Sequence, residues 1–179
     1  MSKQIDSQKE ATDKSPLRIL LIEDSDVDAY IIEKSLRTYM PQAQYLRAAT
    51  LKSGEDILQE GATDVVLLDL GLPDTASPAD TYAHIKKWTD QIPVVIMTNL
   101  KDHALAKVMV HDGAADFINK DVIGKNPRLI QSAIDFSVER HASHKQLKSE
   151  KERAVKDSKE KDSILSCFMG GYSIGGGGK

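Results

Sequence analysis

Residues 64–74 read DVVLLDLGLPD, in which four consecutive apolar side chains are followed by an aspartate. A short run of Val and Leu that ends in a polar residue predicts a strand buried on both faces of a sheet. Comparable runs occur at 18–22, 45–48, 93–97 and 116–118, and the intervals between them show the apolar spacing of helices. The chain therefore alternates strands with helices.

The expected helices cover residues 27–39, 51–59, 79–89 and 104–112, with a last helix from Pro127 onward. This (βα)₅ order predicts an α/β fold: a doubly wound, five-stranded parallel sheet with helices on both faces and right-handed crossovers. Ligands of such sheets bind beyond the carboxyl ends of the strands, near the point where the strand order reverses. A binding site is therefore expected at that edge.

The 179 residues provide for one such domain with tails. Residues 1–16 are polar and without periodicity, so we expect a flexible leader, followed by the domain at 17–140. Residues 141–179 predict an extension of the last helix, rich in Lys and Glu, and then a Gly-rich flexible tail. The extension is either a solvated helix, or a helix that joins two copies into a homodimer or links the domain to another.

Composition excludes several classes of function. The formal net charge of -3 gives no basic surface for direct binding of nucleic acid. No apolar stretch approaches the roughly 20 residues that cross a bilayer, so membrane insertion is not expected. Cys167 is the only cysteine, which rules out an intramolecular disulfide and fits a reducing, cytoplasmic location.

Polar side chains follow four of the expected strands directly. They are Glu23 and Asp24, Asp69, Thr98 and Lys120. Taken singly, they do not require a shared site. Glu23 and Asp24 could cap a helix, and Asp69 could open a turn. Together, at one edge of a parallel sheet, they predict a shared site.

The chemistry of these residues favours a metal ion and a phosphoryl group. Three carboxylates in one cleft repel each other unless a cation offsets their charge, and oxygen ligands without His or Cys select Mg²⁺. A carboxylate such as that of Asp69 can act as the nucleophile that accepts a phosphoryl group. The Thr98 hydroxyl and the Lys120 ammonium could then each contact one phosphoryl oxygen.

The sequence resembles the receiver domains of response regulators of two-component signalling, of the chemotaxis-regulator type, across residues 17–140. Four motifs carry this resemblance: ILLIEDSDVDA, DVVLLDLGLPD, PVVIMTN and DGAADFINKD. The resemblance implies a flavodoxin-like receiver fold in which Asp69 takes a phosphoryl group from a phosphohistidine of a sensor histidine kinase or phosphotransfer protein. The phosphorylated domain would then switch a surface that binds a downstream protein, without being an enzyme beyond its own phosphotransfer and autodephosphorylation.

The resemblance also assigns roles to single residues. It implies that Asp24, Asp69 and the carbonyl of Gly71 bind Mg²⁺, with Glu23 acting through metal-bound water. Thr98 and Phe117 would be the switch residues, together with Lys120 at the phosphoryl group, and Gly71 and Leu100 would tune dephosphorylation. Two residues depart from the family pattern: Asp121 stands where most members have proline, and Phe117 lacks the phenolic hydroxyl of many members.

Two rival functions use the same residues. An aspartate-nucleophile phosphatase of the haloacid-dehalogenase type needs a second acid two residues after its nucleophile, and Gly71 occupies that position. A receiver-like module could instead bind its partner constitutively, without phosphorylation. The complete set of acids, Thr98 and Lys120 argues against that alternative.

Overall fold

The structure is a computed structural model, and it describes residues 15–99 and 103–170 of the chain. Its strands are β1 (Arg18–Ile22), β2 (Gln44–Ala48), β3 (Val65–Asp69), β4 (Val94–Thr98) and β5 (Asp116–Asn119). They form one parallel sheet in the order β2-β1-β3-β4-β5. The expected doubly wound sheet of five parallel strands is therefore confirmed, and the strand order reverses between β1 and β3.

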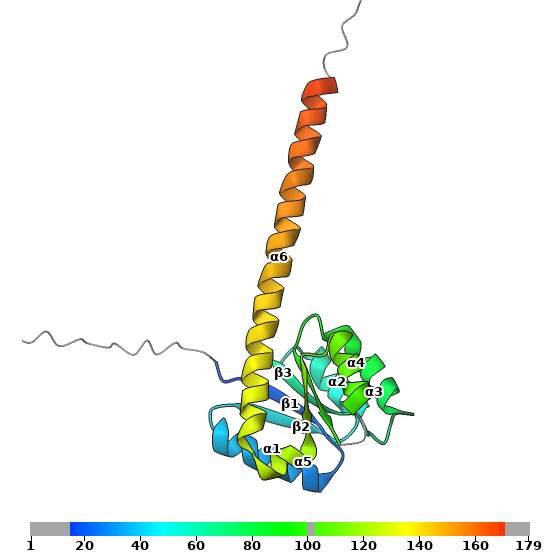
Figure 1. The fold of residues 1–179 in the computed structure, drawn as a ribbon, viewed down its shortest axis with the longest axis vertical. Coiled ribbons are helices and arrows are strands. Elements are labelled where there is room, and N and C mark those ends of the chain that lie inside the picture. The colour runs from blue at the N-terminus through cyan, green and yellow to red at the C-terminus, as the bar shows by residue number, and fades with distance from the viewer. Residues whose placement is uncertain (1–14, 100–102, 171–179) are drawn as a thin grey trace, which may run out of the picture.

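The helices alternate with these strands along the chain. They are α1 (Asp26–Tyr39), α2 (Leu51–Gln59), α3 (Pro78–Ile85) with the 3₁₀ turn η1 (Lys86–Trp88), α4 (His103–His111), α5 (Lys120–Lys125) and α6 (Arg128–Gly170). In Figure 1 the sheet lies between two layers, with α1, α5 and α6 on one face and α2, α3 and α4 on the other. The expected helix at 79–89 ends as an α-helix at Ile85 and continues as the 3₁₀ turn.

The side-chain alternation within each strand builds two hydrophobic cores. In β3, Val65 and Leu67 pack toward α1 and α6, whereas Val66 and Leu68 pack toward α2, α3 and α4. All four side chains are fully buried, which explains why the strand is continuously apolar. Burying both faces fixes the end of this central strand, and with it the position of the aspartate that follows Leu68.

The short helix α5 was not expected from the sequence. Asn119 caps it, because the Asn119 side chain accepts a hydrogen bond from the backbone N–H of Asp121 at 2.8 Å. A proline at position 121 has no N–H to donate, so the departure from the family pattern at this residue permits the cap. Lys120 consequently starts a helix and is fixed at both its backbone and its side chain.

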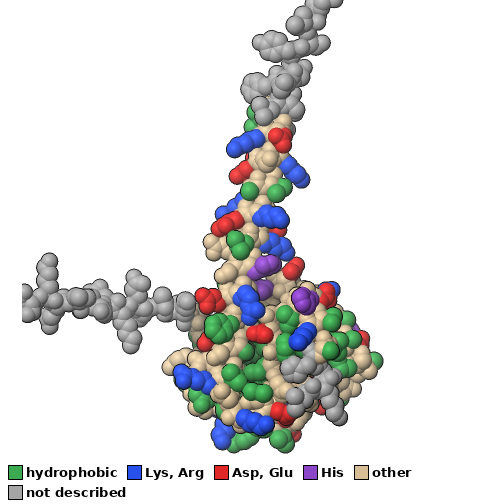
Figure 2. Space-filling view, in the orientation of Figure 1, with side chains coloured by type: hydrophobic (Ala, Val, Ile, Leu, Met, Phe, Trp, Pro, Cys, Tyr) green, Lys and Arg blue, Asp and Glu red, His purple; other side chains and the backbone are tan. Residues whose placement is uncertain are grey.

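Helix α6 has two parts with different surroundings. Its first turns pack against the sheet, with Ile130 and Ile134 fully buried, whereas Leu147 and Val155 are 65% and 48% exposed. Figure 1 shows the second part projecting from the domain, and Figure 2 shows Lys, Arg and acidic side chains around it. The expected boundary at residue 140 falls inside this continuous helix, and the proposed domain limits stay predictions.

The expected leader lies almost wholly outside the described residues, as do residues 171–179 of the Gly-rich tail. Within the described residues, no helix combines the length and apolar character needed to cross a membrane.

Candidate functional site

A cavity of about 260 Å³ lies at the carboxyl ends of β1, β3 and β4, where the strand order reverses. Its lining residues are Glu23, Asp24, Ser25, Asp28, Asp69, Leu70, Gly71, Pro78, Met97, Thr98, Asn99 and Lys120. Most of the residues predicted from the sequence line this one cavity. They come together because parallel strands end at the same edge of the sheet.

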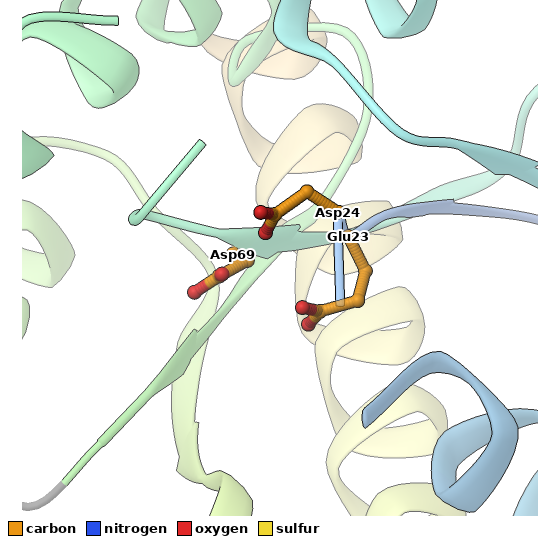
Figure 3. Close-up of side chains that lie close together, drawn as sticks. All are labelled: Glu23, Asp24 and Asp69. Carbon is orange, nitrogen blue, oxygen red and sulfur yellow. The ribbon is translucent and has the colours of Figure 1, made fainter. Parts of the chain in front are cut away.

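Three carboxylates form the acidic part of the cavity. Oxygen atoms of Glu23, Asp24 and Asp69 all lie within 4.8 Å of one another, and Figure 3 shows the three side chains gathered at the ends of β1 and β3. Two unit charges at that distance repel by roughly 3 kcal/mol at an effective dielectric constant near 20. The cluster is therefore suited to a hard divalent cation that prefers oxygen ligands.

Lys120 supplies the positive charge of the cavity, and its side chain is only 8% exposed. Its ammonium nitrogen lies 2.7 Å from Glu23 Oε2, 3.0 Å from Asp69 Oδ2 and 3.1 Å from Asp28 Oδ2. The lysine pairs with Asp69, and two further acids share the same ammonium. One cation faces four carboxylates in the cavity, so the site as a whole has a negative charge.

Burial and charge shift the pKa values of the Glu23–Lys120 pair. Burial raises the pKa of Glu23, the hydrogen bond with Lys120 opposes the rise, and the charge of Asp69 adds to it, so the pKa lies above its ordinary value of 4.5. Burial alone would lower the pKa of Lys120, but the carboxylates of Glu23 and Asp69 outweigh burial and raise it above 10.5. The lysine therefore stays charged at neutral pH.

Thr98 ends β4 with a side chain that is 2% exposed. The residue lines the cavity, and its hydroxyl oxygen is buried without a hydrogen-bond partner within the described part of the chain. A buried hydroxyl without a partner costs about 1–3 kcal/mol, so its presence needs an explanation. A phosphoryl oxygen on Asp69 would give this hydroxyl an acceptor.

Of the remaining predicted residues, Gly71 lines the cavity, whereas Phe117 is not among the described residues that line it. Gly71 lines the cavity two residues after Asp69 and is exposed. Phe117 is half-buried in β5 and packs against the core on the α2–α4 face. Leu100 lies outside the described residues, so its tuning role stays a prediction.

Helix capping is supplied by Ser25, and not by the acidic pair before it. The Ser25 hydroxyl accepts a hydrogen bond from the backbone N–H of Asp28 at 3.3 Å, which makes Ser25 the N-cap of α1. Glu23 instead accepts from the backbone N–H of Ser25 at 3.2 Å and is itself fully buried. The alternative that Glu23 and Asp24 serve only as a helix cap is therefore not supported.

Two residues of the site were missed by the sequence analysis. Asp28 lies in the first turn of α1 and lines the same cavity. Its spacing from Asp24 is not a helical repeat, because Asp24 precedes the N-cap Ser25, so no local signal in the sequence indicated it. Arg47 lies at the end of β2. Its guanidinium donates to the backbone carbonyls of Glu23 at 3.0 Å and Asp24 at 3.1 Å and pairs with Asp26 at 2.7 Å.

Arg47 thus fixes the loop that carries two of the three clustered acids. No local pattern in the sequence indicates this contact, because it joins residues more than twenty positions apart. A guanidinium has five N–H donors on three nitrogens, and here each nitrogen donates to a different acceptor, two carbonyls and one carboxylate. The loop is therefore held by the neighbouring strand as well as by its own helix cap.

Comparison with known proteins agrees with this geometry. The family model of the response regulator receiver domain matches residues 19–134. A curated relative, the transcriptional regulatory protein AfsQ1 of Streptomyces coelicolor, is 34% identical over 110 residues, which are 60% of this chain and 46% of that protein. The chain thus matches about half the length of this relative.

Solved structures show the same fold. The signal receiver domain of a LuxO repressor homologue from Vibrio parahaemolyticus has a TM-score of 0.62 at 22% identity, covering 74% of this chain and 97% of that chain. A response regulator receiver domain protein from Clostridium thermocellum has a TM-score of 0.57 at 25% identity, covering 73% and 98%. From its matched residues, its sheet order and its strand-end cavity, the chain belongs to the response regulator receiver domain family.

Proposed function

We propose that Asp69 accepts a phosphoryl group from a phosphohistidine of a sensor histidine kinase or phosphotransfer protein, in a reaction that needs Mg²⁺. The observation that carries the proposal is the composition of one cavity. It combines a carboxylate nucleophile, a cluster of oxygen ligands, a buried ammonium and an unpartnered hydroxyl. Each of these groups has a separate task in phosphoryl transfer.

The ligand set fits Mg²⁺ in number and in kind. Asp24 and Asp69 can bind the ion directly, Gly71 lines the same cavity and can offer its carbonyl, and Glu23 can act through a water ligand. When bound, Mg²⁺ offsets the negative charge that collects on the attacking and transferred oxygens. The residues of the chain supply the nucleophile and hold it in place.

In the transfer, an Asp69 carboxylate oxygen attacks phosphorus, a P–O bond to that oxygen forms, and the bond from phosphorus to the donor breaks. The leaving group departs with the electron pair, as imidazole from phosphohistidine or as acetate from acetyl phosphate. The Lys120 ammonium, 3.0 Å from Asp69 Oδ2, is placed to pair with the new phosphoryl group. The Thr98 hydroxyl then donates to another phosphoryl oxygen.

Phosphorylation would be read out by a change of packing. Thr98 ends the strand that pairs with β5, and Phe117 lies opposite Ile96 in that pairing. A phosphoryl group that draws the hydroxyl of Thr98 inward would favour an arrangement in which Phe117 turns toward the core. The surface formed by α4, β5 and α6 would then bind a downstream protein.

The proposal treats the chain as a switch and not as an enzyme with an external substrate. Its location is proposed to be cytoplasmic, where kinases of this system act on their partners. Nothing about the net charge of -3 favours direct contact with nucleic acid, so we propose a protein as the downstream target. The Streptomyces relative is a transcriptional regulatory protein, and that role is not proposed for this chain.

The test is to incubate the protein with acetyl phosphate and Mg²⁺ and to measure its intact mass. We expect a mass increase of one phosphoryl group that requires Mg²⁺ and is absent from Asp69→Asn. Asp157→Asn, an exposed substitution on the projecting part of α6, is the matched control and should be phosphorylated like the wild type. A wild-type protein that stays unmodified would contradict the proposal, and so would phosphorylation that persists in Asp69→Asn.

The same experiment distinguishes the alternative of a constitutive binding module. Such a module would bind its partner equally well before and after treatment with acetyl phosphate. The switch predicts a difference in partner capture that the Asp69→Asn variant does not show.

A further inference from the structure

Asp28 is a charged residue of the cavity that the chemistry described so far does not use. Its carboxylate lies 3.1 Å from Lys120 Nζ, its side chain is 35% exposed, and the residue lines the cavity. The residue belongs to the first turn of α1, a position where an acid already interacts favourably with the helix dipole. Contact with the buried lysine is therefore an addition to that local role.

The Lys120 ammonium has only three N–H groups to donate. In this structure it faces three carboxylates, from Glu23, Asp28 and Asp69. A phosphoryl group on Asp69 brings new, more strongly charged acceptors to the same ammonium. One of the present contacts must then lengthen, and Asp28 is the most exposed of the three carboxylates.

We propose that Asp28 is a positioning residue that holds Lys120 in the unphosphorylated protein and competes with the phosphoryl group for its ammonium. This inference rests on the proposed phosphorylation of Asp69. Loss of the Asp28 charge leaves Lys120 with one competitor fewer and lowers the negative charge that an incoming phosphodonor meets. Asp28 therefore disfavours the phosphorylated state and slows its formation.

The size of the effect follows from the distances. Since the contacts of Asp28 and Asp69 to the same nitrogen measure 3.1 and 3.0 Å, their two oxygens lie no more than about 6 Å apart. One unit charge at about that distance from the dianion of acetyl phosphate, acting through water at physiological ionic strength, changes a rate about threefold. Beryllofluoride carries a single negative charge, so its affinity changes about twofold. Low salt should enlarge both factors and high salt should reduce them.

The experiment compares wild type, Asp28→Asn, which keeps the shape of the side chain, and Asp28→Glu, which keeps its charge. Two quantities are measured in Mg²⁺: the initial rate of phosphorylation by acetyl phosphate, and the affinity for beryllofluoride, an anionic mimic of the phosphoryl group. In Asp28→Asn we expect the rate to rise about threefold and the affinity about twofold. Both should return toward wild type in Asp28→Glu. The rise should shrink as the salt concentration increases.

Asp26→Asn is the charge-matched control. Asp26 lies in the same first turn of α1, but its side chain is 91% exposed and pairs with Arg47 and not with Lys120. A helix-wide or long-range effect of charge would give Asp26→Asn the same gain as Asp28→Asn. That result would overturn the inference, because the gain would then not depend on contact with the lysine.

The outcomes separate the two proposals. If the wild type is neither phosphorylated nor bound by beryllofluoride, the proposed function is wrong and this inference is wrong with it. If the wild type responds and Asp28→Asn shows the same rate and affinity as the wild type at low salt, the function stands and the role of Asp28 is refuted.

Discussion

Replacing Asp24 by asparagine should stabilise the protein in the absence of metal. The Asp24 carboxylate lies within 4.8 Å of those of Glu23 and Asp69, and it forms no ion pair within the described part of the chain. Asparagine keeps the shape of the side chain and removes its charge. The substitution therefore removes two repulsions, and it removes no ion pair or side-chain hydrogen bond within the described residues.

The expected magnitude comes from the same distance. Each repulsion amounts to about 0.9 kcal/mol in bulk water and roughly 3 kcal/mol at an effective dielectric constant of 20. The exposed position of Asp24, the general attraction of Lys120 and screening by salt all reduce the sum. We expect Asp24→Asn to gain about 1–2 kcal/mol of unfolding free energy, which corresponds to a rise of about 0.5–1 M in the urea midpoint.

The assay is urea unfolding in EDTA, followed by the same titration at increasing Mg²⁺ concentration. Asp157→Asn, which removes one negative charge from exposed helix surface, is the control and should leave the midpoint nearly unchanged. Added Mg²⁺ should stabilise the wild type, because a ligand that binds only the folded state adds to its stability, and should stabilise Asp24→Asn much less.

One result would refute the reasoning about this cluster. If Asp24→Asn in EDTA is no more stable than Asp157→Asn, the three carboxylates do not repel each other in the folded protein. The argument that their proximity calls for a cation would then fail, whatever the response to Mg²⁺.

Three further outcomes are expected. Thr98→Val should leave the stability of the metal-free protein unchanged or slightly higher, because the buried hydroxyl has no partner among the described residues. The same substitution should weaken beryllofluoride binding, because one hydrogen bond is lost. A clear loss of stability in urea would contradict this expectation. The raised pKa of Glu23 means that the folded state binds this proton more tightly than the unfolded state does. Its contribution to stability is complete below pH 4.5 and is lost as pH rises through the raised pKa, so Glu23→Gln should flatten that part of the stability profile in EDTA. An unchanged slope would count against the pKa shift. If the projecting part of α6 joins two copies, light scattering should give a dimer for the full chain and a monomer for a chain ending at Arg140; equal monomeric masses would exclude the homodimer.

Much of the fold followed from local pattern. The strand limits at 18–22 and the helix limits at 51–59 were predicted to the residue, and the other strands to within one residue at each end. Buried parallel strands are continuously apolar because both of their faces are covered, so they can be recognised from the sequence alone. The sequence also predicted the acids, Thr98 and Lys120 as site residues, because each ends or directly follows such a strand.

Other features depended on contacts between distant segments. Lys120 and Asp28 are 92 positions apart in the chain, and Arg47 meets the loop before α1 only because β2 pairs with β1. Sequence spacing does not indicate that three carboxylates share one ammonium. It also does not indicate that the Thr98 hydroxyl is buried without a partner among the described residues. The sequence by itself determined which chemistry stands at the strand ends, because hydrophobic periodicity is a local property. Only the tertiary structure decided how those charges are paired, because pairing depends on distances that packing sets.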